Sequence, residues 1–222
     1  MEVLINKARR LLENEQVVAH IEPMEKYMKN NFCFLGVKSP ARNKVFRDLW
    51  TQVKPMSVAD QFSWVEDLWK EPEREFQYLG LDTLKRIYKK IPLAFLPRLE
   101  KLILQKSWWD TVDLLAVRNI GYLLLHNPKL RKPKSREWID SEKLWLQRTA
   151  LLFQLSFKNS TDTNLLAENI SLLAANKNFF LRKGAGWALR EYSKTDPKWV
   201  KEFIDKNSIL SNLTVREGSK YL

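Results

Sequence analysis

The sequence repeats with a period of 35 residues, and this period restricts the fold more than any other feature. Sliding the chain by 35 residues aligns four apolar segments that begin at Phe76, Thr111, Leu146 and Leu181. Their fifth positions carry mostly small residues, as expected where neighbouring helices pack closely: Gly80, Leu115, Ala150 and Ala185. A repeat of this length with two helices per unit predicts an all-α, HEAT or armadillo-like solenoid with a concave basic surface.

Helical periodicity extends over nearly the whole chain, because apolar residues recur at intervals of three and four and no alternating segment ends in hairpin turn residues. The expected helices are residues 1–14, 17–31, 40–53, 58–70, 72–90, 93–105, 108–126, 128–140, 142–158, 162–175, 178–194, 197–206 and 211–221. The expected helix N-caps are Ser39, Ser57, Ser107, Asn127, Ser141 and Asp196. The connections are short, so residues 1–222 are expected to form one continuous domain.

The charge of the chain indicates an anionic partner. It has 38 basic and 26 acidic residues, a net charge of +12, and the basic residues are spread over the sequence. This distribution favours nucleic acid, with a membrane surface as the weaker alternative. One Cys and two His leave no internal disulfide and no zinc-ligand spacing, and no apolar run reaches the length of a membrane span. We therefore expect a cytoplasmic protein without an internal disulfide or a zinc site.

The segment around Trp109 and Asp113 combines aromatic and acidic residues in an unusual way. Asp110 is explained by a position in the first turn of a helix that Ser107 caps. Asp113 lies one turn further along, on the same face as Trp109, whereas Trp108 is expected to pack inward. Two interpretations remain open: a solvated carboxylate beside a half-buried Trp, and a functional pair.

The repeat adds weight to the functional interpretation. In a solenoid, equivalent positions of successive helices stack, and the third position of the aligned segments is polar throughout: Tyr78, Asp113, Arg148 and Lys183. Trp109 precedes Asp113 by one turn, and Trp187 follows Lys183 by one turn. We expect these side chains to form a polar and aromatic row on one surface. Trp187 could equally be a core residue.

Several motifs, in this order and spacing, resemble the AlkD-type DNA glycosylases, which are HEAT-like-repeat enzymes of bacterial DNA alkylation repair. The motifs are Met24-Glu25-Lys26-Tyr27-Met28-Lys29-Asn30, Phe34-Leu35-Gly36, Pro72-Glu73-Arg74-Glu75-Phe76-Gln77, Lys106-Ser107-Trp108-Trp109-Asp110, Trp145-Leu146-Gln147-Arg148 and Gly186-Trp187-Ala188-Leu189-Arg190-Glu191-Tyr192. The resemblance covers most of the chain. It implies excision of cationic alkylated purines, such as 3-methyladenine and 7-methylguanine, from double-stranded DNA without metal or cofactor.

The resemblance also implies roles for individual residues. Trp109, Asp113 and Trp187 match the catalytic cleft of the family, Arg148 matches a residue that holds the DNA backbone, and Tyr27 matches a neighbour of the cleft. Two further residues are expected to contact DNA: Lys183 and Arg190. The enzyme would work in the bacterial cytosol, on the nucleoid.

Two alternatives remain at this stage. A non-catalytic relative could keep the solenoid and its basic surface and only bind DNA. A protein-binding HEAT scaffold is the other, and its binding would lack the steep salt dependence of phosphate contacts.

Overall fold

The computed structural model describes residues 1–222, which form helices connected by short loops without any strand. The predicted all-α, helical-repeat class is confirmed. No helix combines the length and the apolar character needed to cross a lipid bilayer. The chain divides into two compact units, Met1–Ile91 and Pro92–Leu222, which are described separately. One continuous domain and a concave surface shared by both units stay predictions.

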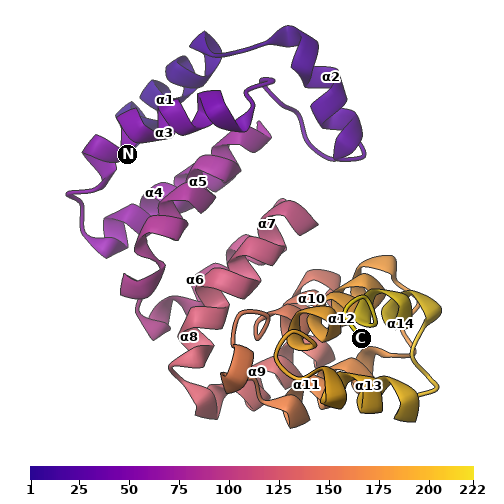
Figure 1. The fold of residues 1–222 in the computed structure, drawn as a ribbon. Coiled ribbons are helices and arrows are strands. Elements are labelled where there is room, and N and C mark those ends of the chain that lie inside the picture. The colour runs from indigo at the N-terminus through magenta and orange to yellow at the C-terminus, as the bar shows by residue number, and fades with distance from the viewer. The chain divides into compact units, whose positions relative to one another are not determined.

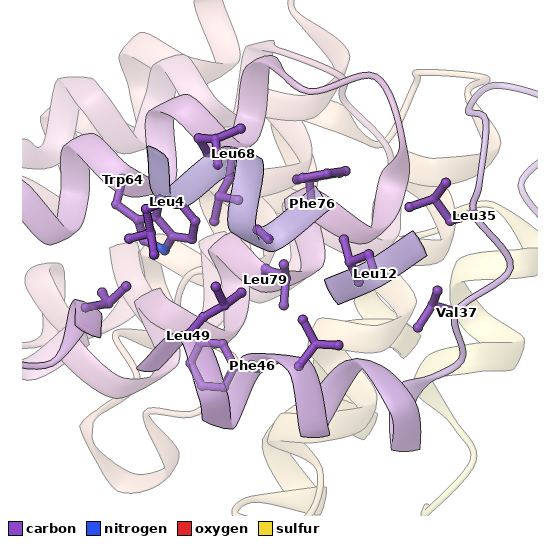
Figure 2. Packing of buried hydrophobic residues seen from close by; sticks show 14 residues of the cluster. Leu4, Leu12, Leu35, Val37, Phe46, Leu49, Trp64, Leu68, Phe76 and Leu79 are labelled. Carbon is purple, nitrogen blue, oxygen red and sulfur yellow. The ribbon is translucent and has the colours of Figure 1, made fainter. Parts of the chain in front are cut away.

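The first unit contains α1 (Glu2–Asn14), α2 (Val18–Tyr27), α3 (Ser39–Val53), α4 (Val58–Lys70), α5 (Arg74–Ile87) and the short η1 (Tyr88–Lys90). Its core, shown in Figure 2, joins the apolar faces of α1, α3, α4 and α5 with the loop that precedes α3. The central side chains are Leu12, Leu49, Trp64, Leu68, Phe76 and Leu79. Helix α2 contributes no buried residue to this core.

A buried carboxylate fixes the loop between α2 and α3. Glu75 of α5 is fully buried and accepts hydrogen bonds from the backbone N–H groups of Leu35 (3.1 Å) and Val37 (3.0 Å). Gly36 between them has φ +80°, and a Cβ there would lie 2.4 Å from the Val17 carbonyl oxygen, so only glycine fits. The loop is thereby held against α5.

The second unit contains η2 (Leu93–Phe95), α6 (Leu96–Leu104), α7 (Trp109–Leu114), the π-helical η3 (Leu115–Ile120), α8 (Gly121–Leu125), η4 (Pro128–Leu130), α9 (Arg131–Asp140), α10 (Leu144–Leu152), η5 (Lys158–Ser160), α11 (Thr163–Leu173), α12 (Phe179–Tyr192), α13 (Pro197–Lys206) and α14 (Asn212–Gly218). Helix α10 packs against α7 and α12, and α12 packs against α14. Figure 1 shows α9, α11 and α13 beside α10, α12 and α14.

The row α7, α10, α12 and α14 is the structural form of the 35-residue repeat. Residues about one repeat apart touch: Asp113 contacts Arg148, and Lys183 contacts Glu217. Corresponding positions of successive helices are therefore neighbours, as the repeat predicts. Any polar residues at those positions must then satisfy one another or face solvent.

Several predicted helix ends are wrong for local reasons. Helix α2 ends at Tyr27 instead of residue 31, because Lys29 and Asn30 adopt left-handed backbone conformations with φ 57°. Helix α10 spans only 144–152 of the predicted 142–158, after Glu142 with φ 56°. The predicted helix 108–126 begins at Trp109 and contains a π-helical segment at 115–120.

The predicted caps are confirmed at Ser57 and Asp196, whose side chains accept from Asp60 N and Trp199 N. The other four side chains make no cap hydrogen bond, although Asn127 does hold the N-cap position of η4 before Pro128. Ser107 donates backward to the Ile103 carbonyl, Asn127 to that of Leu123, and Ser141 to that of Trp138. Ser39 is already inside α3. A hydroxyl or amide after a helix can serve the carbonyls behind it as well as the N–H groups ahead.

Replacing Glu75 tests its role in the first unit. Glu75→Ala should lower the free energy of unfolding by about 2–5 kcal/mol, since two buried N–H groups lose their acceptors. Glu75→Gln keeps one carbonyl oxygen as an acceptor, so its free energy of unfolding should fall distinctly less. Urea unfolding of both variants measures the difference. Equal losses would show that the hydrogen bonds of Glu75 do not hold the loop.

Candidate active site

Asp113 and Arg148 form a two-pronged ion pair between α7 and α10. Arg148 Nε lies 2.7 Å from Asp113 Oδ1, and Nη2 lies 2.8 Å from Oδ2. The two side chains are only 13% and 5% exposed. Asp113 is therefore not a solvated carboxylate, and that interpretation of the sequence is wrong. The pair does confirm that Asp113 and Arg148 point to the same side.

The surroundings of Arg148 fix its guanidinium. Its Nη1 donates to the backbone carbonyl of Phe180 at the start of α12. A Cβ at Gly184 would lie 3.1 Å from the same nitrogen, so glycine gives the guanidinium room between α10 and α12. Three of the five N–H donors of an arginine are thus used. Two remain for a ligand that reaches Arg148.

A cavity of about 360 Å³ opens beside this ion pair. It is lined by Trp109, Asp113, Arg148, Phe179, Phe180, Lys183, Trp187 and Arg190. Six of the seven site residues expected from the sequence thus lie together. Trp187 is half-buried at the cavity and is not a core residue. Tyr27 and Tyr78 belong to the first unit, so their part in this site stays a prediction.

Aromatic side chains form much of the cavity wall. Phe180 packs against Trp108 and Trp145 with ring centroids 5.1 and 5.0 Å apart. Trp108 packs inward, as predicted. Phe179 is 57% exposed at the cavity. Such a wall offers flat apolar faces to a planar ligand.

The motifs of the sequence did not predict that Phe179 and Phe180 line the site, although the spacing of Phe179 indicates it. Phe179, Lys183 and Trp187 are spaced by four residues and share one face of α12. Asn178, whose side chain accepts from Phe180 N at 2.8 Å, caps this helix. In this sequence, Asn178 caps the helix, Phe179 and Phe180 begin its first turn, and the following turns carry Lys183 and Trp187.

The electrostatics of Asp113 reflect two opposed effects. Burial raises the pKa of the Asp113 carboxyl above its usual value, while the hydrogen bonds and the charge of Arg148 lower this pKa. Asp110, in the first turn of α7, raises it further. Arg148 is therefore the group that favours the carboxylate form in a site that otherwise favours the acid.

Lys183 and Arg190 lie at the same cavity and share one partner. Both pair with Glu217 of α14, at 3.1 and 3.0 Å. Nowhere in the chain are three or more His, Cys, Asp or Glu side chains grouped to hold a metal ion. The cavity thus combines one paired carboxylate, aromatic walls and a cationic side.

A model of the family of DNA alkylation repair enzymes matches residues 8–222. The chain belongs to this family. A solved structure described as a predicted DNA alkylation repair enzyme from Enterococcus faecalis is similar to it, with 30% sequence identity and a TM-score of 0.86 over 94% of this chain and 97% of the other. No curated protein sequence matches. The resemblance to DNA alkylation repair enzymes that the sequence motifs carry is thereby confirmed.

In this alkylation repair enzyme, removal of Arg148 should expose the cost of burying Asp113. Arg148→Met should lower the free energy of unfolding by about 3–5 kcal/mol near neutral pH, because a buried charge loses its partner. The loss should be much smaller near pH 4. Without Arg148, the pKa of Asp113 in the folded state lies further above its pKa in the unfolded state. The stability of the variant therefore falls as the pH rises from the unfolded-state pKa to the folded-state pKa.

Urea unfolding at both pH values measures this. The control is Arg148→Met combined with Asp113→Asn, which leaves no buried charge and should show little pH dependence from this site. An equal loss at both pH values would mean that the unpaired charge is not the cause.

Proposed function

We propose that the chain is a DNA glycosylase that hydrolyses the N-glycosidic bond of cationic alkylated purines, of the 3-methyladenine and 7-methylguanine type, in duplex DNA. The observation that carries the proposal is the carboxyl group of Asp113, held by two hydrogen bonds from Arg148, in an aromatic cavity with Lys183 and Arg190 beside it. Membership of the DNA alkylation repair enzyme family supports DNA as the substrate.

The chemistry of the substrate fits a site with one carboxylate. Alkylation at a ring nitrogen gives the base a positive charge, so it leaves as a neutral base without first receiving a proton. As the bond from C1′ to the base nitrogen breaks, its electron pair goes to the base and positive charge develops on the sugar. The Asp113 carboxylate stabilises this charge and orients a water molecule. Water then bonds to C1′ and releases a proton.

The tryptophans and Arg148 assist this step. Trp109 and Trp187 present electron-rich faces to the sugar, and a cation over such a face gains about 0.5–2 kcal/mol. Arg148 holds the Asp113 carboxylate in one orientation through two hydrogen bonds. Its two remaining N–H groups suit a phosphate oxygen, so the backbone contact expected from the sequence is kept as part of the proposal. Lys183, Arg190 and Tyr27 complete the proposed DNA contacts.

The proposed enzyme needs neither metal nor cofactor, because the leaving group is already activated. It would act as a monomer on chromosomal DNA in the cytoplasm of a bacterium. A steep dependence of binding on salt would accompany the phosphate contacts.

The central test replaces the charge of Asp113. Asp113→Asn should reduce excision by about 10²–10³-fold, equivalent to about 2.7–4 kcal/mol of transition-state stabilisation. Binding to undamaged duplex should survive, because an acidic group near phosphates is removed. Single-turnover release of 7-methylguanine, duplex affinity and thermal unfolding should be measured for each variant.

Asp110→Asn is the matched control, since Asp110 lies one turn earlier on the same helix. A folded Asp110 variant that loses more activity than the Asp113 variant would mean that the wrong carboxylate is assigned. Duplex binding without any base release by the unmodified protein would favour a non-catalytic DNA-binding relative, in which Asp113 only neutralises Arg148.

A further inference from the structure

A single buried carboxylate gathers three cations on one side of α12 and α14. Glu217 Oε1 pairs with Lys183 Nζ at 3.1 Å, and Glu217 Oε2 pairs with Arg190 Nη1 at 3.0 Å and Lys220 Nζ at 3.0 Å. The Glu217 side chain is 5% exposed, while those of Lys183 and Lys220 are 42% and 47% exposed. Three cations thus share one anion, and the two lysine side chains are also partly exposed to solvent.

The position of this carboxylate is set by close helix packing. A Cβ at Gly186 of α12 would lie 2.6 Å from Glu217 Cβ and 2.9 Å from the Thr214 carbonyl oxygen, so the absence of a side chain lets α14 approach α12. The Thr214 hydroxyl donates to the Arg182 carbonyl at 3.1 Å and attaches α14 to α12 again. The carboxylate therefore has a fixed place from which to orient mobile lysine and arginine side chains.

The charge of the cluster calls for a further anion. One carboxylate against three cations leaves two positive charges in excess. Lysine and arginine side chains that repel one another would spread into solvent without a shared partner. Because Lys183 and Arg190 also line the cavity of Asp113, this excess would repel a cationic base from the cavity unless an anion neutralised it.

We propose that Glu217 is a positioning residue that assembles Lys183, Arg190 and Lys220 into a binding site for one phosphodiester group of the DNA backbone, beside the cavity that takes the alkylated nucleotide. The inference rests on the proposed function, because it takes DNA as the ligand. It adds Glu217 and Lys220, which contribute to binding through the arrangement of charges and not through the chemistry of excision. The bound phosphate reduces the excess of positive charge in the cluster from two to one, and so weakens the repulsion of a cationic nucleotide at the neighbouring cavity.

The sign of one substitution distinguishes this role from a general electrostatic effect. Glu217→Gln removes a negative charge, so a general attraction to DNA predicts tighter binding. A positioning role predicts weaker binding, by about tenfold, because the cations lose their common partner. The slope of log affinity against log salt should fall by about one, as expected for the loss of one phosphate contact. Fluorescence anisotropy with an undamaged duplex measures both.

Glu191→Gln is the matched control. Glu191 lies on the same helix and pairs with Lys194, which is not part of the cluster, so the same change of charge should leave binding unchanged or slightly tighter. Lys183→Met should weaken binding in the unmodified protein and have little further effect in the Glu217→Gln background. The proposal would be overturned if the Glu217→Gln and Glu191→Gln variants bound DNA with the same affinity and the same salt slope.

Lys220→Met gives a second test that does not depend on a buried residue. Lys220 is half-exposed near the end of the chain, and its loss should weaken duplex binding and lower the salt slope while thermal unfolding is unchanged. Unchanged duplex binding by the Lys220 variant would show that Lys220 is not part of the site. If the Glu217→Gln variant also failed to fold, the proposal would be overturned.

Release of 7-methylguanine, measured separately, distinguishes this inference from the glycosylase function. If duplex binding responds as described but no base is released, the glycosylase function alone is contradicted. If the base is released but the variants bind duplex as the unmodified protein does, this inference alone is contradicted.

Discussion

The ion pair of Asp113 and Arg148 is the interaction on which the arrangement of the second unit depends. It joins α7 to α10 through two short hydrogen bonds, and the same guanidinium reaches α12 at the Phe180 carbonyl. Desolvating two charges is unfavourable by itself, and only this complete set of partners offsets it. Loss of either charge alone therefore destabilises the second unit, and the relative positions of three helices are tied to the geometry of one arginine.

The repeat explains why such a pair arises at this place. Equivalent positions of α7, α10 and α12 carry Asp113, Arg148 and Lys183, and Glu217 of α14 lies one residue before the next equivalent position, so the charges along the row are acidic, basic, basic and acidic. Each end of this row is an acid that a neighbouring base neutralises. The glycines at 184 and 186 supply the space beside Arg148 and Glu217 that the large side chains need. The residue near one position of each repeat unit thus sets the sign of the charge at each step along the row of helices.

The sequence predicted most helices, the period and six of the residues that line one cavity, because periodicity and spacing are local properties. It did not predict how charged groups pair. Asp113 and Arg148 are separated by 35 residues, and only the packing of α7 against α10 makes them partners. The cap at Ser107 failed for a local reason: a left-handed Lys106, with φ 48°, turns the chain so that the hydroxyl serves the preceding helix. A tertiary contact decided the first case and the backbone conformation of one residue decided the second.

Under the proposed function, the pairing of Asp113 with Arg148 favours the charged carboxylate that a cationic substrate requires. Burial alone raises the pKa of Asp113, and a protonated Asp113 would have no charge to offer the developing sugar cation. Arg148 counteracts this effect of burial and favours the carboxylate form. Under the proposed function, the leaving group is activated beforehand, because an alkylated purine is already cationic. An unmodified purine, which needs a proton to leave, would be released far more slowly, because Arg148 disfavours the protonated form of Asp113.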